Sequence, residues 1–180
     1  QLKKRLEEEH VLVENHPYVK DALLISKYDY LESLETFREG LFVVQDISSM
    51  LGGELAHVQA GAQVIDLCAA PGGKALDVAE RILMEGQAGC SGHVEARDLT
   101  EYKVSLIEEN IERMGLCNVT AVCQDASVYD EKSAGKADIV IADLPCSGLG
   151  VLGKKTDLKY KASPEVSSTS STPSKATYAS

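Results

Sequence analysis

The stretch Val64-Ile65-Asp66-Leu67-Cys68-Ala69-Ala70-Pro71-Gly72-Gly73-Lys74 decides the fold of this chain. A short apolar run ends at an acid, and a turn of small residues with one proline and two glycines follows it. Apolar residues at helical spacing come next, over residues 75–83. The pattern predicts a strand, a tight turn and a helix N-terminus, an arrangement that places backbone N–H groups around a nucleotide-like ligand.

Strand and helix patterns alternate through the rest of this half of the chain. We predict two helices, at about 73–84 and at 101–114, and Gly115 is expected to stop the second. The predicted strands are residues 64–67, 93–96, 119–123 and 139–142. Alternation at this spacing predicts an α/β fold with a doubly wound, mostly parallel, Rossmann-like sheet.

The two ends of the chain have different patterns. Residues 1–41 predict a small α+β appendage, with a charged helix over 2–9 and short strands at 11–13 and 22–25. Between residues 42 and 57 the pattern becomes helical after Gln45, and Asp46 or Ser48 is expected to cap that helix. In residues 166–180, nine of fifteen are Ser or Thr, which predicts a disordered tail. The expected organisation is therefore appendage 1–41, sheet domain 42–165 and tail 166–180.

The composition excludes several classes of protein. A net charge of −10 argues against a broad nucleic-acid-binding surface. One small basic cluster remains, which is equally well explained as a solvated turn: Lys154, Lys155, Lys159 and Lys161. No apolar run approaches membrane-spanning length, and the charged N-terminus does not resemble a signal peptide. Because the sequence does not begin with Met, we expect a chain that starts inside a longer protein or has been processed.

The cysteines indicate a reducing compartment. The chain has five of them, an odd number without a C-x-x-C pair: Cys68, Cys90, Cys117, Cys123 and Cys146. This usage fits free thiols and a cytoplasmic location better than a disulfide framework. The spacing also offers no zinc site, and no metal is expected.

Four acids fall at the expected carboxyl ends of the four strands, where a sheet of this kind places its ligand. They are Asp66, Asp98, Asp125 and Asp143, in the order of the strands. A carboxylate after the second strand suits ribose hydroxyls, and one after the third suits an adenine amino group. Asp is also common at strand ends because it caps the following helix. Four acids in register with the glycine-containing turn favour a ligand site.

Lys74 and Cys146 are two further candidate site residues. The turn has neither G-x-G-x-x-G nor a P-loop pattern, so dinucleotide and P-loop sites are disfavoured. Lys74 is expected to contact a ligand or substrate, because the helix dipole disfavours a cation in the first turn. Cys146 lies in Asp143-Leu144-Pro145-Cys146-Ser147-Gly148 after the fourth strand, where a small-residue turn suits a reactive thiol. The other reading of Cys146, a small buried hydrophobe, is less favoured.

With both motifs in place, the sequence resembles the NOL/NOP/Sun family of RNA cytosine-5 methyltransferases, in particular the bacterial RsmB/Sun type that acts on ribosomal RNA. The resemblance covers roughly residues 1–165. The matching stretches are FVVQDISS at 42–49, DLCAAPGGK at 66–74, NIERMG at 110–115 and DLPCSGLG at 143–150. It implies an incomplete, Rossmann-like S-adenosylmethionine-dependent methyltransferase domain over residues 42–165, and an appendage of RNA-binding type.

The resemblance also implies a site and a chemistry. The implied S-adenosylmethionine contacts are Cys68, Ala69, Ala70, Pro71, Gly72, Gly73, Lys74, Asp98, Asp125 and Asp143. In this family a thiolate adds to C6 of cytosine, C5 then takes the methyl group, and a base removes the C5 proton. The chemistry is covalent catalysis with two aligned reactants, on a base that has left its stack.

The chain departs from the family at the nucleophile. The family nucleophile lies in a Thr-Cys motif on a later strand, and no Thr-Cys occurs in this sequence. Cys146 matches the assisting thiol that releases the product, with Asp143 beside it. About seven strands and an upstream helical domain are also expected, so we predict a chain incomplete at both ends and inactive alone. Two alternatives are a non-catalytic remnant that binds cofactor or RNA, and, less favoured, an RNA 2′-O methyltransferase.

Overall fold

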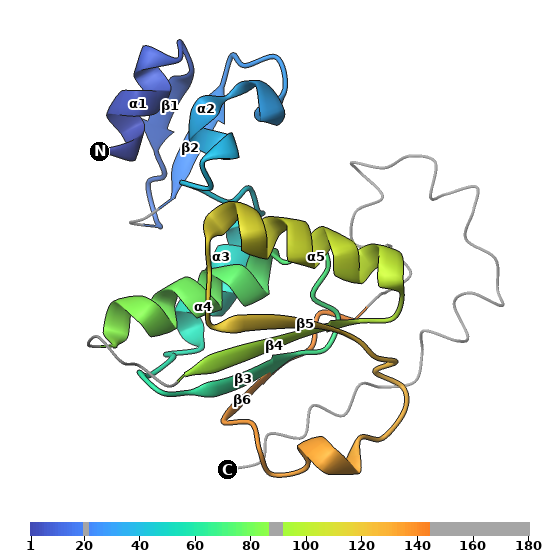
Figure 1. Ribbon diagram of the computed structural model, residues 1–180. Helices are drawn as coiled ribbons and strands as arrows, with labels where there is room; N and C mark the ends of the chain where they lie inside the picture. Colours follow the sequence, from blue (N-terminus) through green and yellow to red (C-terminus); the bar gives the residue numbers. More distant parts are fainter. Residues whose placement is uncertain (20–21, 87–91, 145–180) are drawn as a thin grey trace, which may run out of the picture. The chain divides into compact units, whose positions relative to one another are not determined.

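A four-stranded parallel sheet forms the centre of the molecule (Figure 1). The computed structural model describes residues 1–19, 22–86 and 92–144. The strands are β3 (Gln63–Asp66), β4 (His93–Asp98), β5 (Val119–Cys123) and β6 (Ile139–Ile141). Their order across the sheet is β5-β4-β3-β6, with every neighbouring pair parallel. The predicted α/β fold with a Rossmann-like sheet is confirmed.

Two long helices cover one face of this sheet, α4 (Gly73–Glu85) and α5 (Glu101–Met114) (Figure 1). Both agree with the predicted helices, and Gly115 ends α5 in a left-handed conformation, as expected. Helix α4 presents an almost fully buried aliphatic stripe to the strands. Its partners include Val64 and Val94 from β3 and β4, and Ile107 from α5. This stripe fixes the start of α4 directly beyond the end of β3.

The opposite face carries the connection from β5 to β6. This connection contains a single short 3-10 helix, η2 (Glu131–Ser133), on the side of the sheet away from α4 and α5 (Figure 1). Because successive side chains of a strand alternate between faces, Val94 and Ala96 point toward the helices while Glu95 and Arg97 point toward η2. Within the described residues, the two faces are therefore covered unequally.

The appendage (residues 1–41) has its own small core. It comprises α1 (Leu2–Glu8), the antiparallel strands β1 (Leu12–Asn15) and β2 (Leu23–Ser26), η1 (Leu31–Ser33) and α2 (Glu35–Arg38). Its core cluster consists of the buried residues Leu6, Val11, Val13 and Leu34 and is separate from the cluster of the sheet. The predicted helix and short strands are thus confirmed. Residues Gln1–Asp143 nevertheless form one compact unit.

Helix α3 (Ile47–Leu55) follows the appendage, where the helical pattern was expected. Asp46 is its N-cap residue, but the predicted side-chain cap is wrong. The Asp46 side chain makes no capping hydrogen bond and is exposed, and the helix begins with backbone bonds from Ser49 and Met50 N–H to the Asp46 carbonyl. Solvation of the carboxylate replaces the expected cap.

Arg113 joins the appendage to α5. Its guanidinium lies 4.0 Å from the centre of the Phe37 ring and donates to the carbonyl oxygens of Phe37 (2.8 Å) and Phe42 (3.2 Å). Gly40 lies at the same contact with φ +71°, so close to the backbone of α5 that a Cβ there would be 2.0 Å from the Arg113 carbonyl oxygen. The approach of these two backbones requires glycine.

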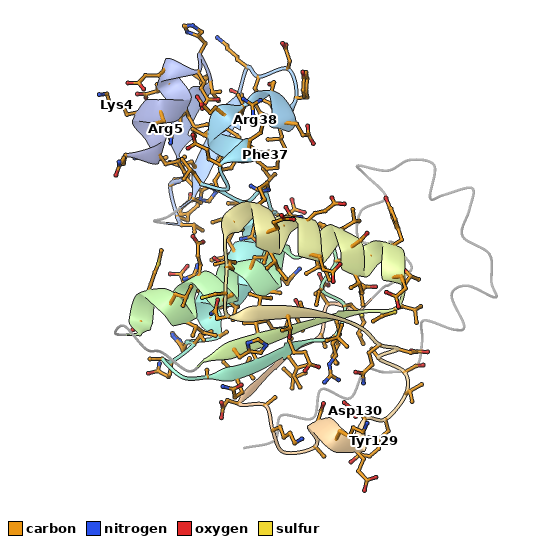
Figure 2. All side chains as sticks on the ribbon, viewed as in Figure 1. Lys4, Arg5, Phe37, Arg38, Tyr129 and Asp130 are labelled. Carbon is orange, nitrogen blue, oxygen red and sulfur yellow. The ribbon has the colours of Figure 1, made fainter. Side chains whose placement is uncertain are left out.

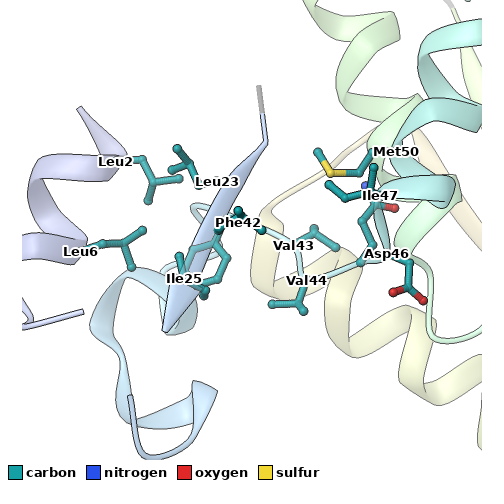
Figure 3. Close-up of a pocket in the computed structure, with 12 residues that line it drawn as sticks. Leu2, Leu6, Leu23, Ile25, Phe42, Val43, Val44, Asp46, Ile47 and Met50 are labelled. Carbon is teal, nitrogen blue, oxygen red and sulfur yellow. The ribbon is translucent and has the colours of Figure 1, made fainter. Parts of the chain in front are cut away.

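An apolar cavity of about 310 Å³ lies between the appendage and the segment that leads into α3 (Figure 3). Leu6 and Ile25 line one side of it, and Val43 and Met50 line the other. The cavity lacks the converging acids that the sequence placed at the strand ends, so it is not the predicted ligand site. None of the helices in the described ranges has the length and apolar character needed to cross a membrane.

Candidate functional site

The small-residue turn (residues 67–72) is held by strands on both sides of β3. Leu67 N–H donates to the Ile141 carbonyl of β6 at 2.9 Å, and Ala69 N–H donates to the Arg97 carbonyl of β4 at 2.8 Å. Gly72 N–H closes the turn onto the Ala69 carbonyl at 2.7 Å. The turn therefore sits where the strand order switches from β4 to β6, which is where open α/β sheets bind ligands.

Gly72 makes the entry into α4 possible. Its φ is +114°, a backbone conformation that residues with a Cβ rarely adopt. A Cβ at this position would also lie 3.1 Å from Leu76 Cδ1. The first intrahelical bond runs from Leu76 N–H to the Gly72 carbonyl. The N–H groups of Gly73, Lys74 and Ala75 precede it and have no carbonyl partner within the helix. The start of α4 thus offers backbone N–H donors at the positive end of the helix dipole.

Asp98 connects the turn to α5. Its carboxylate is buried, and it accepts from Ala70 N–H at 3.1 Å, from Leu99 N–H at 2.8 Å and from Lys103 Nζ at 2.9 Å. Burial opposes ionisation, but these three donors outweigh it, and the pKa of Asp98 lies below its ordinary range. The predicted site residue therefore stays ionised and organises the turn itself.

Asp66, the last residue of β3, is 1% exposed. Its Oδ1 accepts weakly from Cys68 N–H at 3.4 Å, and its Oδ2 has no hydrogen-bond partner. Burial raises the pKa of Asp66 from its ordinary value near 3.8 to about 6. A buried carboxylate oxygen without a donor is costly in free energy, and a ligand amino group at the turn would supply one.

Asp66→Asn is expected to raise the free energy of unfolding by about 2 kcal/mol at pH 8. The raised pKa means that the folded wild-type chain loses stability as the pH rises from about 4 to about 6, and that it stays less stable above this range. The amide carries no charge and still offers one oxygen to Cys68 N–H. Urea unfolding at pH 4.5 and pH 8 measures the difference.

The matched control for this measurement is Asp98→Asn, because the pKa of Asp98 is shifted in the opposite direction. Its loss of stability should be nearly the same at pH 4.5 and pH 8, because both values lie above the ordinary pKa of 3.8, where the stabilising effect of a lowered pKa is almost fully present. If Asp66→Asn raised the free energy of unfolding by the same amount at both pH values, the role assigned to the buried charge would be contradicted.

Lys74 and Asp143 form an ion pair across the end of the sheet. Lys74 Nζ lies 2.6 Å from Asp143 Oδ2, and the Asp143 side chain is 63% exposed. The helix dipole disfavours a cation in the first turn of α4, and Asp143 compensates the charge of Lys74 there. A part in ligand binding remains a prediction for both residues.

The remaining predicted contacts lie around the same edge. Burial raises the pKa of the half-buried Cys68 thiol, and the charges of Asp98, Asp66 and Asp143 raise it further. Cys68 is therefore not an activated nucleophile. Asp125 lies two residues beyond β5, and its Oδ1 accepts from Ser127 N–H (2.8 Å) and Ser127 Oγ (2.7 Å), which lower the pKa of Asp125.

Cys146 lies outside the described residues, as do Cys90, the four lysines and the tail. In the part of the chain with assigned positions, Cys117 and Cys123 are exposed free thiols. Among those same residues, no group of three or more His, Cys, Asp or Glu side chains is placed to hold a metal ion.

Two supporting residues escaped the sequence analysis. Lys103 is partly exposed and binds Asp98, and Asn110 donates through Nδ2 to the Pro71 carbonyl at 3.1 Å. Arg113 in turn donates to Asn110 Oδ1 at 2.9 Å. The position of Lys103 in the first turn of the helix that follows Asp98 was the signal that could have identified it. The Asn110 contact depends on packing of α5 over the turn.

Residues 55–175 match the model of the family described as 16S rRNA methyltransferase RsmB/F. The probable ribosomal RNA small subunit methyltransferase B of Bacillus subtilis (strain 168) is 35% identical over 158 residues, which are 87% of this chain and 34% of that protein. The ribosomal RNA small subunit methyltransferase B of Yersinia pseudotuberculosis (strain IP 31758) is 33% identical and covers 82% of this chain and 33% of its own length.

Two solved structures are also similar to this chain. The crystal structure of PH0851 superposes with a TM-score of 0.80 at 27% identity, over 93% of this chain and 37% of that one. NSun6 from Pyrococcus horikoshii, solved with SFG, has a TM-score of 0.63 at 27% identity, over 83% of this chain and 37% of its own. The chain spans about a third of the length of the curated relatives it matches.

Proposed function

Because the chain belongs to the 16S rRNA methyltransferase RsmB/F family, we propose that it supplies the S-adenosylmethionine-binding part of an enzyme that methylates C5 of cytosine in small-subunit ribosomal RNA. The proposal places this work in the cytoplasm. The observation that carries it is the position of Asp98, whose carboxylate joins the turn, β4 and α5 at the edge where the sheet binds ligands.

The residues at this edge fit the chemical groups of S-adenosylmethionine. The unpartnered Oδ2 of Asp66 would accept a hydrogen bond from an amino group of the ligand. The backbone N–H groups at the start of α4, which have no intrahelical partner, would face the ligand's carboxylate. Asp98 suits the ribose hydroxyls and Asp125 the adenine amino group. A relative, NSun6, is solved with SFG, an analogue of this ligand. When bound, S-adenosylmethionine supplies a methyl group activated by its sulfonium.

The proposed tasks of the chain's own residues are binding and orientation. Cys68, Ala69, Ala70, Pro71, Gly72 and Gly73 would hold the ligand with their backbone, and Lys74 and Asp143 would close the far side. Cys146 is proposed as the assisting thiol beside Asp143, by its place in the Pro-Cys motif. The sequence contains no Thr-Cys, so the thiolate that would attack cytosine C6 is not supplied by this chain.

The 180-residue chain is therefore expected to bind S-adenosylhomocysteine without transferring methyl groups to RNA. Calorimetry measures the binding, and incorporation of label from S-adenosylmethionine into small-subunit ribosomal RNA measures transfer. Failure to bind would contradict the ligand assignment. Methyl transfer by the chain alone would contradict the prediction that it lacks the nucleophile. If that transfer were unaffected by Cys146→Ser, the 2′-O methyltransferase alternative would be favoured.

We further propose that residues 1–41 act as a separate RNA-binding module. Its support is a core of its own, together with the family membership of the adjoining sheet domain. Lys4, Arg5 and Arg38 give it cationic groups (Figure 2). All three are engaged within the appendage, since Lys4 pairs with Glu8 at 3.7 Å, Arg5 pairs with Glu39 at 2.6 Å, and Arg38 donates to the Glu32 and Ser33 carbonyls. The boundaries of the sheet domain at residue 42 and of the tail at residue 166 both remain predictions.

A further inference from the structure

We propose that Arg97 is a positioning residue that fixes residues 124–133 and thereby holds Asp125 for the adenine end of the ligand. The proposal rests on the proposed function. Arg97 is a charged residue within β4, between Ala96 of the core and Asp98 of the site. It is 4% exposed, so its guanidinium is buried on the face of the sheet that η2 covers.

The guanidinium has three partners, which come from two separate elements. Nε contacts Glu95 Oε1 of the same strand at 2.5 Å. Nη2 donates to Ser133 Oγ at 2.5 Å, and Nη1 lies 3.3 Å from Asp130 Oδ2. Asp130, labelled in Figure 2, is the N-cap residue of η2, and Ser133 is its last residue; both lie more than thirty residues along the chain from Arg97. The contacts tie the connection between β5 and β6 to the central part of the sheet.

Asp130 extends this network toward Asp125. It accepts from the Ser133 hydroxyl, from Lys132 N–H at 3.1 Å and from the side chain of Gln124. Gln124 also donates from its N–H to the Asp98 carbonyl at 2.8 Å. The residue after Gln124 is Asp125. Arg97 thus acts on both ends of the segment, through Ser133 at one end and through Asp130 and Gln124 at the other.

The backbone of Arg97 contributes to the same site. Its carbonyl accepts from Ala69 N–H, so the residue that anchors residues 124–133 also anchors the small-residue turn. One strand position thereby fixes the distance between the turn and Asp125. Asp125 itself is oriented by Ser127 but is exposed, so its place depends on the segment that carries it. A role in ligand selection therefore follows from the geometry, beyond a role in stability.

The test compares Arg97→Met with Arg97→Lys and with the matched control Arg81→Met. Arg81 also forms an ion pair, with Asp77 at 3.0 Å, but on α4, away from η2. Hydrogen exchange of the ligand-free chain is measured first. In Arg97→Met, the amides of residues 124–133 should exchange about tenfold faster than in wild type. In Arg97→Lys, their exchange rate should lie between those of Arg97→Met and wild type. In Arg81→Met they should exchange at the wild-type rate.

Ligand selection is measured by calorimetry with S-adenosylhomocysteine and with S-inosylhomocysteine, which has an oxo group in place of the adenine amino group. We expect wild type and Arg81→Met to prefer the adenosyl compound, and Arg97→Met to lose about tenfold of that preference. Unchanged exchange in Arg97→Met overturns the proposal. Faster exchange with an unchanged preference also overturns it, because the role of Arg97 would then be structural only.

The same experiment separates the failure of this proposal from the failure of the proposed function. If the wild-type chain binds neither compound, the ligand assignment is wrong, and so is the role of Arg97 toward the adenine end. Faster exchange of residues 124–133 in Arg97→Met would in that case still support the ordering of this segment by Arg97.

Discussion

Asp98→Ala is expected to lower the affinity for S-adenosylhomocysteine at least about a hundredfold and the free energy of unfolding by about 3 kcal/mol. The carboxylate accepts from two backbone N–H groups and from Lys103, and its removal leaves these donors unpaired next to the turn. The loss of affinity has two sources, the missing contact to the ribose hydroxyls and the loosening of the turn. Calorimetry and urea unfolding measure the two effects separately.

Asp98→Asn is the matched control for this variant. The amide keeps the shape of the side chain and one accepting oxygen, so it should lose less stability than alanine while still weakening ligand binding. Because the pKa of Asp98 lies below its ordinary range, its stabilising effect is present at neutral pH and is lost as the pH falls through the folded-state pKa. Equal stability of Asp98→Ala and wild type at pH 7 would contradict the assigned hydrogen bonds.

Gly40→Ala is expected to lower the free energy of unfolding by about 3 kcal/mol or more. The new Cβ would lie 2.0 Å from the Arg113 carbonyl oxygen and 2.7 Å from Met114 Cα, both backbone atoms of α5 that a side-chain rotation cannot move. The appendage would have to shift away from α5 and give up the contacts between Arg113 and Phe37. Urea unfolding followed by circular dichroism measures the loss.

Gly135→Ala isolates the steric part of this effect. Gly135 has φ +68°, close to the +71° of Gly40, but a Cβ there would meet no atom within 4 Å. It should cost only the backbone strain, about 1 kcal/mol. Equal losses in the two variants would show that the contact between Gly40 and α5 does not limit stability.

The sequence predicted the sheet because its strands are short apolar runs separated by glycine-containing turns and helical patterns. The errors are at the strand ends. β4 extends to Asp98 instead of ending at Ala96, because Arg97 and Asp98 pair in register with Val122 and Cys123 while their side chains find partners on other elements. Polarity near the end of a strand was interpreted as the start of a loop.

The sequence predicted that Asp66 and Asp98 lie at one edge of the sheet, whereas the contacts within that edge could not be predicted; the role of these residues in ligand binding stays a prediction. Asp66 and Asp98 could be placed because the carboxyl ends of parallel strands meet at one edge. The partners of Arg97 could not be predicted, because Asp130 and Ser133 reach it only when the connection from β5 to β6 folds over the sheet. The same holds for the contact of Asn110 with the Pro71 carbonyl, which depends on how α5 lies over the turn.

If a ligand binds at the unpartnered Oδ2 of Asp66, as proposed above, ligand binding would be coupled to the release of a proton. A ligand amino group that donates to this oxygen would favour the ionised carboxylate and lower the pKa from its value of about 6. Below that pH, each binding event would then displace a proton into the solution. Affinity would rise with pH up to about 6, and the measured heat of binding would follow the ionisation heat of the buffer.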